Sequence, residues 1–283
     1  MRDELLKFEF VCTCVIDNYS KRSDSENNSD IRYKLPDKRC FQPFVFQSTK
    51  DDQLVMLHKL LNLELFEKKI KISLPNEIGL SLNIAERSLL EAVRNNKLLS
   101  EAVADEKIFY KENIKVFYDY LESIQVAIVF SYKAIESFCN AIIPQDFVYI
   151  KVNHKGIEER YKLKEIERWI PTSEKLTEIV TSVLKCDSPK NEFFWPFFKK
   201  LEKLRNEIIH SKKTSSVEVV SQLFSQEIFE IIPSSMSILQ YFLKQDITNE
   251  AFPFGFFNQA FKVHKIDNPE EVLKKISNGE AAL

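Results

Sequence analysis

Apolar residues recur every three or four positions through most of this chain, a spacing that predicts α-helices. The broadest apolar surface lies in residues 109–143. On a helical wheel one face of that segment carries Phe117, Tyr120, Leu121, Ile124, Ile128, Ser131, Ile135, Phe138 and Ile142. A helix this apolar is typical of the centre of a bundle, and Pro144 favours its termination. We therefore expect residues 109–143 to be the central helix of a helical domain.

Shorter helical patterns lie on both sides of this segment. We expect helices over residues 83–99, over residues 191–211, and from Thr172 or Ser173, either of which can cap a helix. The spacing Ser215-x-x-Glu218 matches a capping box and predicts one further long helix through residue 242, bent near residue 233. Residues 147–163 predict a β-hairpin or a long excursion between helices, followed by a short helix over 164–169.

The first part of the chain differs from the rest. Residues 8–16 are dense in β-branched and aromatic side chains, and residues 31–35 and 41–46 are further candidate strands. Residues 18–30 form a polar loop, and residues 51–69 have an apolar pattern compatible with a helix. The predicted organisation is a β-rich accessory or sensing region over 1–75, a helical bundle over 76–250, and a C-terminal tail over 251–283 packed on the bundle.

Composition and charge narrow the function classes. The chain is 44% hydrophobic and 29% charged, as in globular proteins, and its 4 glycines form no Gly-rich phosphate loop. The net charge of -2 gives no signal for a polyanion partner over the whole chain. No apolar run reaches the roughly 20 residues of a membrane span, and the acidic N-terminus does not resemble a signal peptide. We expect a cytoplasmic protein without a membrane segment.

Metal and cofactor sites are not indicated by the sequence. The 5 cysteines are scattered, and Cys12 and Cys14 have C-x-C rather than C-x-x-C spacing. The 4 histidines lie far apart, so no set with zinc-ligand spacing is present. We expect reduced core thiols, no metal and no cofactor.

The segment that carries chemistry is Arg205-Asn206-Glu207-Ile208-Ile209-His210, late in an amphipathic pattern. It resembles the R-x4-6-H motif of HEPN-domain ribonucleases. The resemblance covers roughly residues 83–245 and implies an up-and-down helical bundle. It also implies a metal-independent endoribonuclease of a bacterial toxin or phage-defence system. Further implications are a homodimer whose two motifs line one cleft, RNA as substrate, and an antitoxin or sensor protein as partner.

The residue types suit this chemistry. The unperturbed pKa of histidine lies near 6.5, so His210 can move protons near neutral pH. Arg205 has a permanent charge and forked donors for a phosphate in the transition state. Asn206 can orient the phosphate or the imidazole, and Glu136 and Lys203 are candidate supporting residues. Residues 185–213 carry eight Lys/Arg against four Asp/Glu, so the charge near the motif is positive.

Helix geometry imposes a condition on the motif. Five residues apart on an ideal helix, Arg205 and His210 lie about 140° apart around the axis. They converge only if the helix ends near His210, if Arg205 reaches around, or if a second protomer supplies the other group. Dimerisation answers this most simply. Asn206 and His210, at i and i+4, share a face.

A structural interpretation of the same residues stays open. Arg205 can be tied into a salt bridge, with Glu136 as a plausible partner, and His210 can simply end a helix beside two lysines. Ser131 then packs as a small residue, and Tyr132 is either a cleft wall or core. The aromatic residues between 193 and 198 can stack bases, or they form core or a dimer interface. On this interpretation the bundle is a non-catalytic scaffold, and a nucleotide-binding regulatory subunit of a larger complex is a third alternative.

Overall fold

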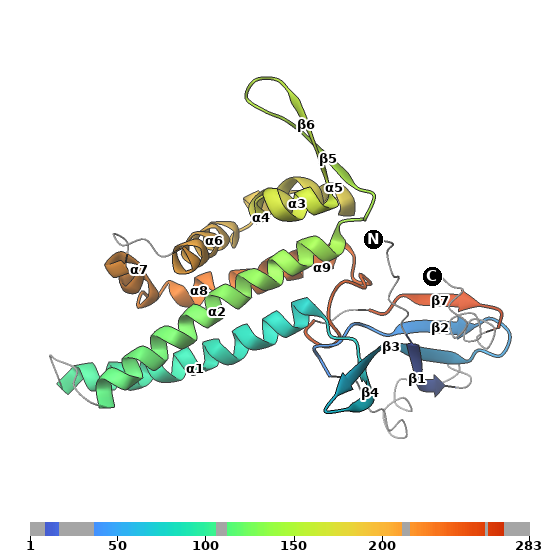
Figure 1. Cartoon of the computed structure of the whole chain (residues 1–283), viewed down its shortest axis with the longest axis horizontal. Helices are drawn as coiled ribbons and strands as arrows, with labels where there is room; N and C mark the ends of the chain where they lie inside the picture. The colour runs from blue at the N-terminus through green and yellow to red at the C-terminus, as the bar shows by residue number, and fades with distance from the viewer. Residues whose placement is uncertain (1–8, 17–36, 106–111, 211–215, 258–259, 269–283) are drawn as a thin grey trace. The chain divides into compact units, whose positions relative to one another are not determined.

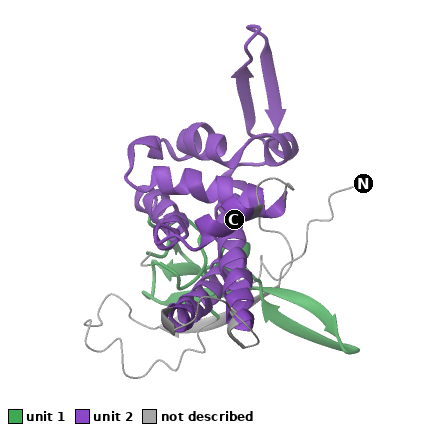
Figure 2. Cartoon of the chain, turned by 90° about the vertical axis from the view of Figure 1, so that its left-hand side faces the viewer, with its two compact units in different colours: residues 1–79, 247–283 green, residues 80–246 purple. Residues whose placement is uncertain are grey.

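The helices of this chain are gathered in its middle part, and most of its strands form one small sheet (Figure 1). The computed structural model describes residues 9–16, 37–105, 112–210, 216–257 and 260–268. It contains two units: a sheet unit of residues 1–79 and 247–283, and a helical unit of residues 80–246 (Figure 2). The mainly α fold predicted from the sequence is confirmed. No described helix has both the length and the apolar character needed to cross a membrane.

The centre of the helical unit is α2 (Glu112–Ile142). It packs against α4 (Thr172–Glu174), α5 (Val180–Leu184), α6 (Trp195–Ile209), α7 (Ser216–Leu223) and α9 (Ser234–Gln245). Ile124, Ile128 and Ile135 are completely buried, as the apolar face of this segment predicted. The expectation of a central helix here is therefore confirmed.

Helix α1 (Glu77–Asp105) precedes α2, and it is longer than the predicted 83–99 segment. It buries Leu82, Ala85, Ala92 and Leu99, which follow the helical period. The ammonium of Lys133 on α2 donates to Ser81 Oγ on α1 over 3.5 Å. This contact joins the two longest helices at the start of α1.

The predicted hairpin is confirmed as β5 (Val148–Val152) and β6 (Glu158–Lys162), which pair antiparallel. In Figure 1 it projects from the helices of its unit. The turn needs Gly156, whose φ of 76° is in the left-handed region that favours glycine. Helix α3 (Leu163–Trp169) follows directly, and its first turn is closed by Glu165, whose carboxylate accepts the Lys162 N–H at 2.8 Å.

The helix expected from Thr172 or Ser173 contains an unpredicted wide turn. Three α-helical residues, Thr172–Glu174, are followed by a π-helix, η3 (Lys175–Ile179), and then by α5. A π-turn adds one residue to the helical repeat, so side chains four and five apart come to share a face. The 3₁₀ turn η4 (Pro189–Asn191) leads on to α6.

The prediction of one long last helix through residue 242 was wrong. The structure has three helices instead: α7, α8 (Ile228–Ile231) and α9. Serine side chains compete for backbone carbonyls at both breaks, since Ser225 donates to Gln222 and Ser234 donates to Ile231. Pro233 precedes α9 and has no N–H to continue a helix. Ser215, the first residue of the capping box, lies outside the described residues.

The sheet unit contains β1 (Glu9–Ile16), β2 (Phe44–Ser48), β3 (Leu54–Leu65), β4 (Lys68–Ser73) and β7 (Val263–Ile266). The strand order is β1-β3-β2-β7, and β4 also pairs with β3. The predicted strand at 8–16 is confirmed, and the one at 41–46 is shifted to Phe44–Ser48. The segments 18–30 and 31–35 lie outside the described residues.

The helix expected over residues 51–69 was wrong, because β3 and the start of β4 occupy this segment. The two strands are joined by Phe66 and Glu67, both with positive φ (50° and 63°), as in a type I′ turn. Such turns are usually marked by Asn-Gly or Asp-Gly. Without that signal the hairpin could not be told from a helix.

The last part of the chain also differs from its prediction. Residues 251–283 were expected to pack on the bundle as a tail, whereas residues from 247 on belong to the sheet unit. Strand β7 pairs in parallel with β2, from Val45↔Val263 to Ser48↔Ile266. The physical reason is that β2 has a second edge, whose backbone groups need partners.

We expect Ile128→Ala to lower the free energy of unfolding by about 2–5 kcal/mol, because it leaves a cavity beside a completely buried side chain. Val126→Ala on the same helix is the matched control, since Val126 is 37% exposed. Urea unfolding followed by the helical circular dichroism signal measures both. Equal losses for the two variants would contradict the central position of α2.

Candidate functional site

The motif residues lie at the C-terminal end of α6. This helix buries Phe198, Leu201 and Leu204 on its apolar face. His210 is its C-cap residue and leaves the helical conformation, with φ -114° and ψ 52°, while its N–H donates to the Asn206 carbonyl at 3.0 Å. The condition that the helix end near His210 is met. The side chain of His210 is exposed.

The guanidinium of Arg205 is held by three neighbours. Its Nη1 donates to Asn206 Oδ1 at 3.0 Å, and its Nη2 lies 3.5 Å from Glu136 Oε2. It also lies over the ring of Tyr132, with 5.0 Å from Cζ to the ring centroid, a cation–π contact. Glu136 and Tyr132 both belong to α2, so the contacts join α6 to the central helix. The ion pair between Arg205 and Glu136 that the sequence left open is present.

The structure therefore brings Arg205, Asn206 and Glu136 together. Lys203 is not part of this group, because it points to Glu207 over 3.8 Å and its side chain is 65% exposed. His210 shares the helix end and contacts Asn206 through the backbone. The motif is thus a polar cluster on the side of α6 followed by an exposed imidazole at its end.

A buried carboxylate beside the cluster was missed from the sequence. Glu202 accepts hydrogen bonds from Tyr132 Oη at 3.1 Å and from the Ser173 N–H at 3.3 Å, and it pairs with the Lys199 ammonium. A buried carboxylate requires such partners, since desolvation disfavours the charged form. Burial raises the pKa of Tyr132 well above its usual value, so this phenol stays protonated and keeps donating to Glu202. The one available signal was the i, i+4 spacing of Glu202 from the buried Phe198.

A pocket of about 530 Å³ lies in the helical unit, and its lining includes Ser173 and Lys199, two of the partners of Glu202. It is lined by Tyr149, Lys151, Ser173, Glu174, Thr177, Glu178, Lys190, Trp195 and Lys199. These side chains come from β5, α4, the π-helix, η4 and the first five residues of α6. The π-helix forms one wall, and π-turns within helices are frequent at functional sites.

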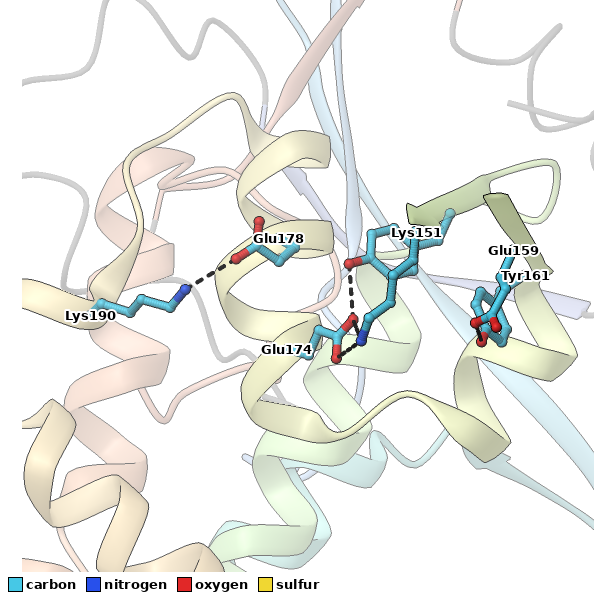
Figure 3. A network of polar contacts seen from close by, with 7 residues as sticks. Lys151, Glu159, Tyr161, Glu174, Glu178 and Lys190 are labelled. Carbon is cyan, nitrogen blue, oxygen red and sulfur yellow. Dashed lines mark hydrogen bonds and ion pairs between the residues drawn. The ribbon is translucent and has the colours of Figure 1, made fainter. Parts of the chain in front are cut away.

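Ion pairs join charged side chains that line this pocket (Figure 3). Both carboxylate oxygens of Glu174 lie 2.7 Å from the Lys151 ammonium, and Tyr149 Oη donates to the same carboxylate at 2.9 Å. Glu178 pairs with Lys190 at 3.1 Å. Burial and the hydrogen bond to Glu174 raise the pKa of Tyr149, so its hydroxyl is a donor at neutral pH. The pocket therefore offers ammonium, carboxylate, hydroxyl and aromatic groups together.

The described residues contain no group of three or more His, Cys, Asp or Glu side chains that could hold a metal ion. Comparison with protein-family models, with curated proteins and with solved structures finds no match for this chain. The family assignment therefore stays a resemblance carried by the motif.

We expect Tyr132→Phe to lower the free energy of unfolding by about 1.5–3 kcal/mol, because it removes a hydrogen bond to a charged, buried carboxylate. The variant keeps the aromatic ring over which the Arg205 guanidinium lies. Tyr118→Phe, at a side chain on α2 that is 56% exposed, is the matched control and should have little effect. Thermal and urea unfolding measure both. An unchanged stability of Tyr132→Phe would show that Glu202 does not depend on this donor.

Proposed function

We propose that this protein is a metal-independent endoribonuclease of the HEPN type, acting in a toxin or phage-defence system. The observation that carries the proposal is the arrangement at the end of α6. Arg205 is oriented by Glu136 and Asn206, and His210 is exposed where the helix ends. Metal-free RNA cleavage needs a group that moves protons and a positive charge that stabilises the transition state, and an accessible imidazole and an arginine fixed by its neighbours can supply them.

In the proposed reaction the ribose 2′-oxygen attacks the adjacent phosphorus, and the bond from phosphorus to the 5′-oxygen breaks. A proton leaves the 2′-hydroxyl and a proton is delivered to the departing 5′-oxygen, so the products are a 2′,3′-cyclic phosphate and a 5′-hydroxyl. His210 carries one of these proton transfers. Arg205 stabilises the charge on the phosphoryl oxygens.

The contacts of Arg205 leave donors for a phosphate. A guanidinium has five N–H donors, and its hydrogen bonds with described residues use two of them. The side chain is 26% exposed, and the 3.5 Å distance to Glu136 is at the long end for a hydrogen bond. Glu136 therefore orients the guanidinium without enclosing it.

A homodimer is part of the proposal. Arg205 belongs to the group packed on α2, whereas His210 extends from the end of the helix, so a second copy would bring the two groups of opposite protomers to one phosphate. A nuclease of this kind requires restraint in the cell. The proposed partner is an antitoxin or sensor protein, with the sheet unit as its docking region.

The competing function is a non-catalytic scaffold, and one observation favours it. Glu136, Tyr132 and Arg205 connect α2 to α6, and such contacts stabilise a bundle without any chemistry. The two functions differ in what the exposed imidazole does. In a scaffold, His210 contributes to neither turnover nor folding.

We expect His210→Ala to lower the rate of RNA cleavage by about 10²–10⁴-fold, the usual range for general acid–base catalysis. The melting temperature should not change, because the side chain is exposed. Cleavage by the purified protein is measured in EDTA with single-stranded RNA, and the product ends are identified. His154→Ala, at the turn of the hairpin, is the control histidine. Unchanged cleavage by His210→Ala would contradict the proposed role of His210 and favour the scaffold function.

We expect Arg205→Lys to be impaired as well, because an ammonium keeps the charge and loses the fork that binds two oxygens. Arg168→Lys, at an arginine next to the exposed Trp169, is the matched control and should cleave normally. Rates are compared at equal folded fraction, determined by thermal unfolding. Loss of activity only in proportion to unfolding would assign Arg205 to packing alone.

A further inference from the structure

One face of α6 carries a continuous set of polar and aromatic side chains. Trp195, Lys199, Lys203, Asn206 and His210 follow one another at intervals of four, four, three and four residues. At 100° per residue they lie within about 80° of arc around the helix axis. We call this set the α6 stripe. All its members are exposed except Trp195, which is half-buried.

The α6 stripe connects the pocket to the motif. Trp195 and Lys199 line the pocket at the start of the helix, and His210 lies at its end. At 1.5 Å per residue the two ends are about 22 Å apart. A straight helix fixes this separation, so anything bound in the pocket has a defined position relative to His210.

We propose that the pocket and the α6 stripe together bind single-stranded RNA. One base of the strand stacks in the pocket against Trp195, and the phosphates that follow lie on Lys199 and Lys203 as the strand continues to His210. This inference rests on the proposed ribonuclease function and names the subsite that positions its substrate. Aromatic stacking combined with a row of cations is how proteins bind single strands without reading their sequence.

The charges of the pocket are compatible with this occupant. Lys190 pairs with Glu178 and Lys199 with Glu202, and about half of each ammonium side chain is exposed. The exposed pair of Lys190 and Glu178 contributes little stability, so the Lys190 ammonium can turn to a phosphate at small cost. Lys199 pairs with the buried Glu202, but its ammonium has three N–H donors and its hydrogen bonds with described residues use two of them, so one is left for a phosphate. The carboxylate of Glu178 is also half-exposed and can accept hydrogen bonds from base amino or ribose hydroxyl groups. A pocket with both charges thus suits a nucleotide unit better than a simple anion.

The neighbouring face of α6 provides a contrast. Lys200 follows Lys199 directly and therefore points about 100° away from it, and about 60° away from Lys203, the nearest member of the stripe. Its ammonium pairs with Glu227, the residue just before α8. Lys200 has an exposure close to that of Lys199, so charge alone does not separate the two residues. The two lysines differ in their position around the helix axis.

The test measures binding of a fluorescent single-stranded RNA, 2′-O-methylated throughout so that it cannot be cleaved, to the full chain by anisotropy. We expect Trp195→Ala to weaken binding by about tenfold or more, the usual effect of removing a base-stacking ring. Trp195→Phe keeps a ring and should retain most of the affinity. Trp169→Ala removes an exposed tryptophan at the end of α3 and should bind like the unaltered protein.

The lysines are tested in the same assay over a range of salt concentrations. Lys199→Ala and Lys203→Ala should each weaken binding and make it less dependent on salt, since each removes one phosphate contact. Lys200→Ala is the matched control and should leave both quantities unchanged. Trp195 contacts Phe198, and Lys199 pairs with the buried Glu202, so either variant can lose stability. Lys203→Ala, at a side chain that is 65% exposed, decides the question even if those two variants do not fold.

Three outcomes would overturn the inference. The first is that the unaltered protein does not bind the RNA. The second is that folded Trp195→Ala, Lys199→Ala and Lys203→Ala all keep the affinity of the unaltered protein. The third is that the Trp169→Ala and Lys200→Ala controls lose as much affinity as these variants. The outcome for the subsite is separate from that for the proposed function. Cleavage that survives His210→Ala beside binding that depends on Trp195 would remove the nuclease assignment and keep the RNA subsite.

Discussion

The helical unit is organised around one buried carboxylate. Glu202 is 9% exposed, and a charge at such a position is tolerated only when donors surround it. Its donors come from three elements: Tyr132 on α2, the backbone of Ser173 on α4, and Lys199 on α6 itself. Satisfying this one group therefore fixes three helices relative to one another. The Arg205 guanidinium lies over the ring of Tyr132, and Ser173 and Lys199 belong to the lining of the pocket. The motif and the pocket are therefore both connected to Glu202.

What the sequence predicted well follows from periodicity over long segments. The wide apolar face of residues 109–143 identified the central helix. The amphipathic pattern of residues 191–211 identified α6, which the structure bounds at Trp195–Ile209. Elements that depend on particular backbone angles were missed. The turn at Phe66 and Glu67 has two positive φ values in residues that rarely adopt them, so β3 and β4 looked helical. Strand β7 depends on pairing with β2, more than two hundred residues earlier, which no local pattern reports.

In the candidate site, too, local sequence patterns predicted some residues, and long-range contacts hid the others. Arg205, Asn206 and His210 were found because they lie within six consecutive residues, and Glu136 because it lies on the flank of the predicted central helix. The pocket was not found, since its lining comes from five segments and none has a motif of its own. Its wall depends on the π-helix at Lys175–Ile179, a single-residue widening that leaves no trace in hydrophobic spacing. Glu202 was not singled out in the sequence, because its burial depends on Tyr132, seventy residues away.

The parallel pairing of β7 with β2 has a consequence for the order in which the protein is made. The sheet unit is discontinuous, because the whole helical unit lies between its two parts in sequence. A growing chain contains every residue of the helical unit before Val263–Ile266 has been synthesised. Domains generally fold as units during synthesis, from the N-terminus onward. The bundle that carries Arg205 and His210 thus has the opportunity to fold while the sheet still lacks its edge strand. Nascent chains would then present the motif before the protein is complete.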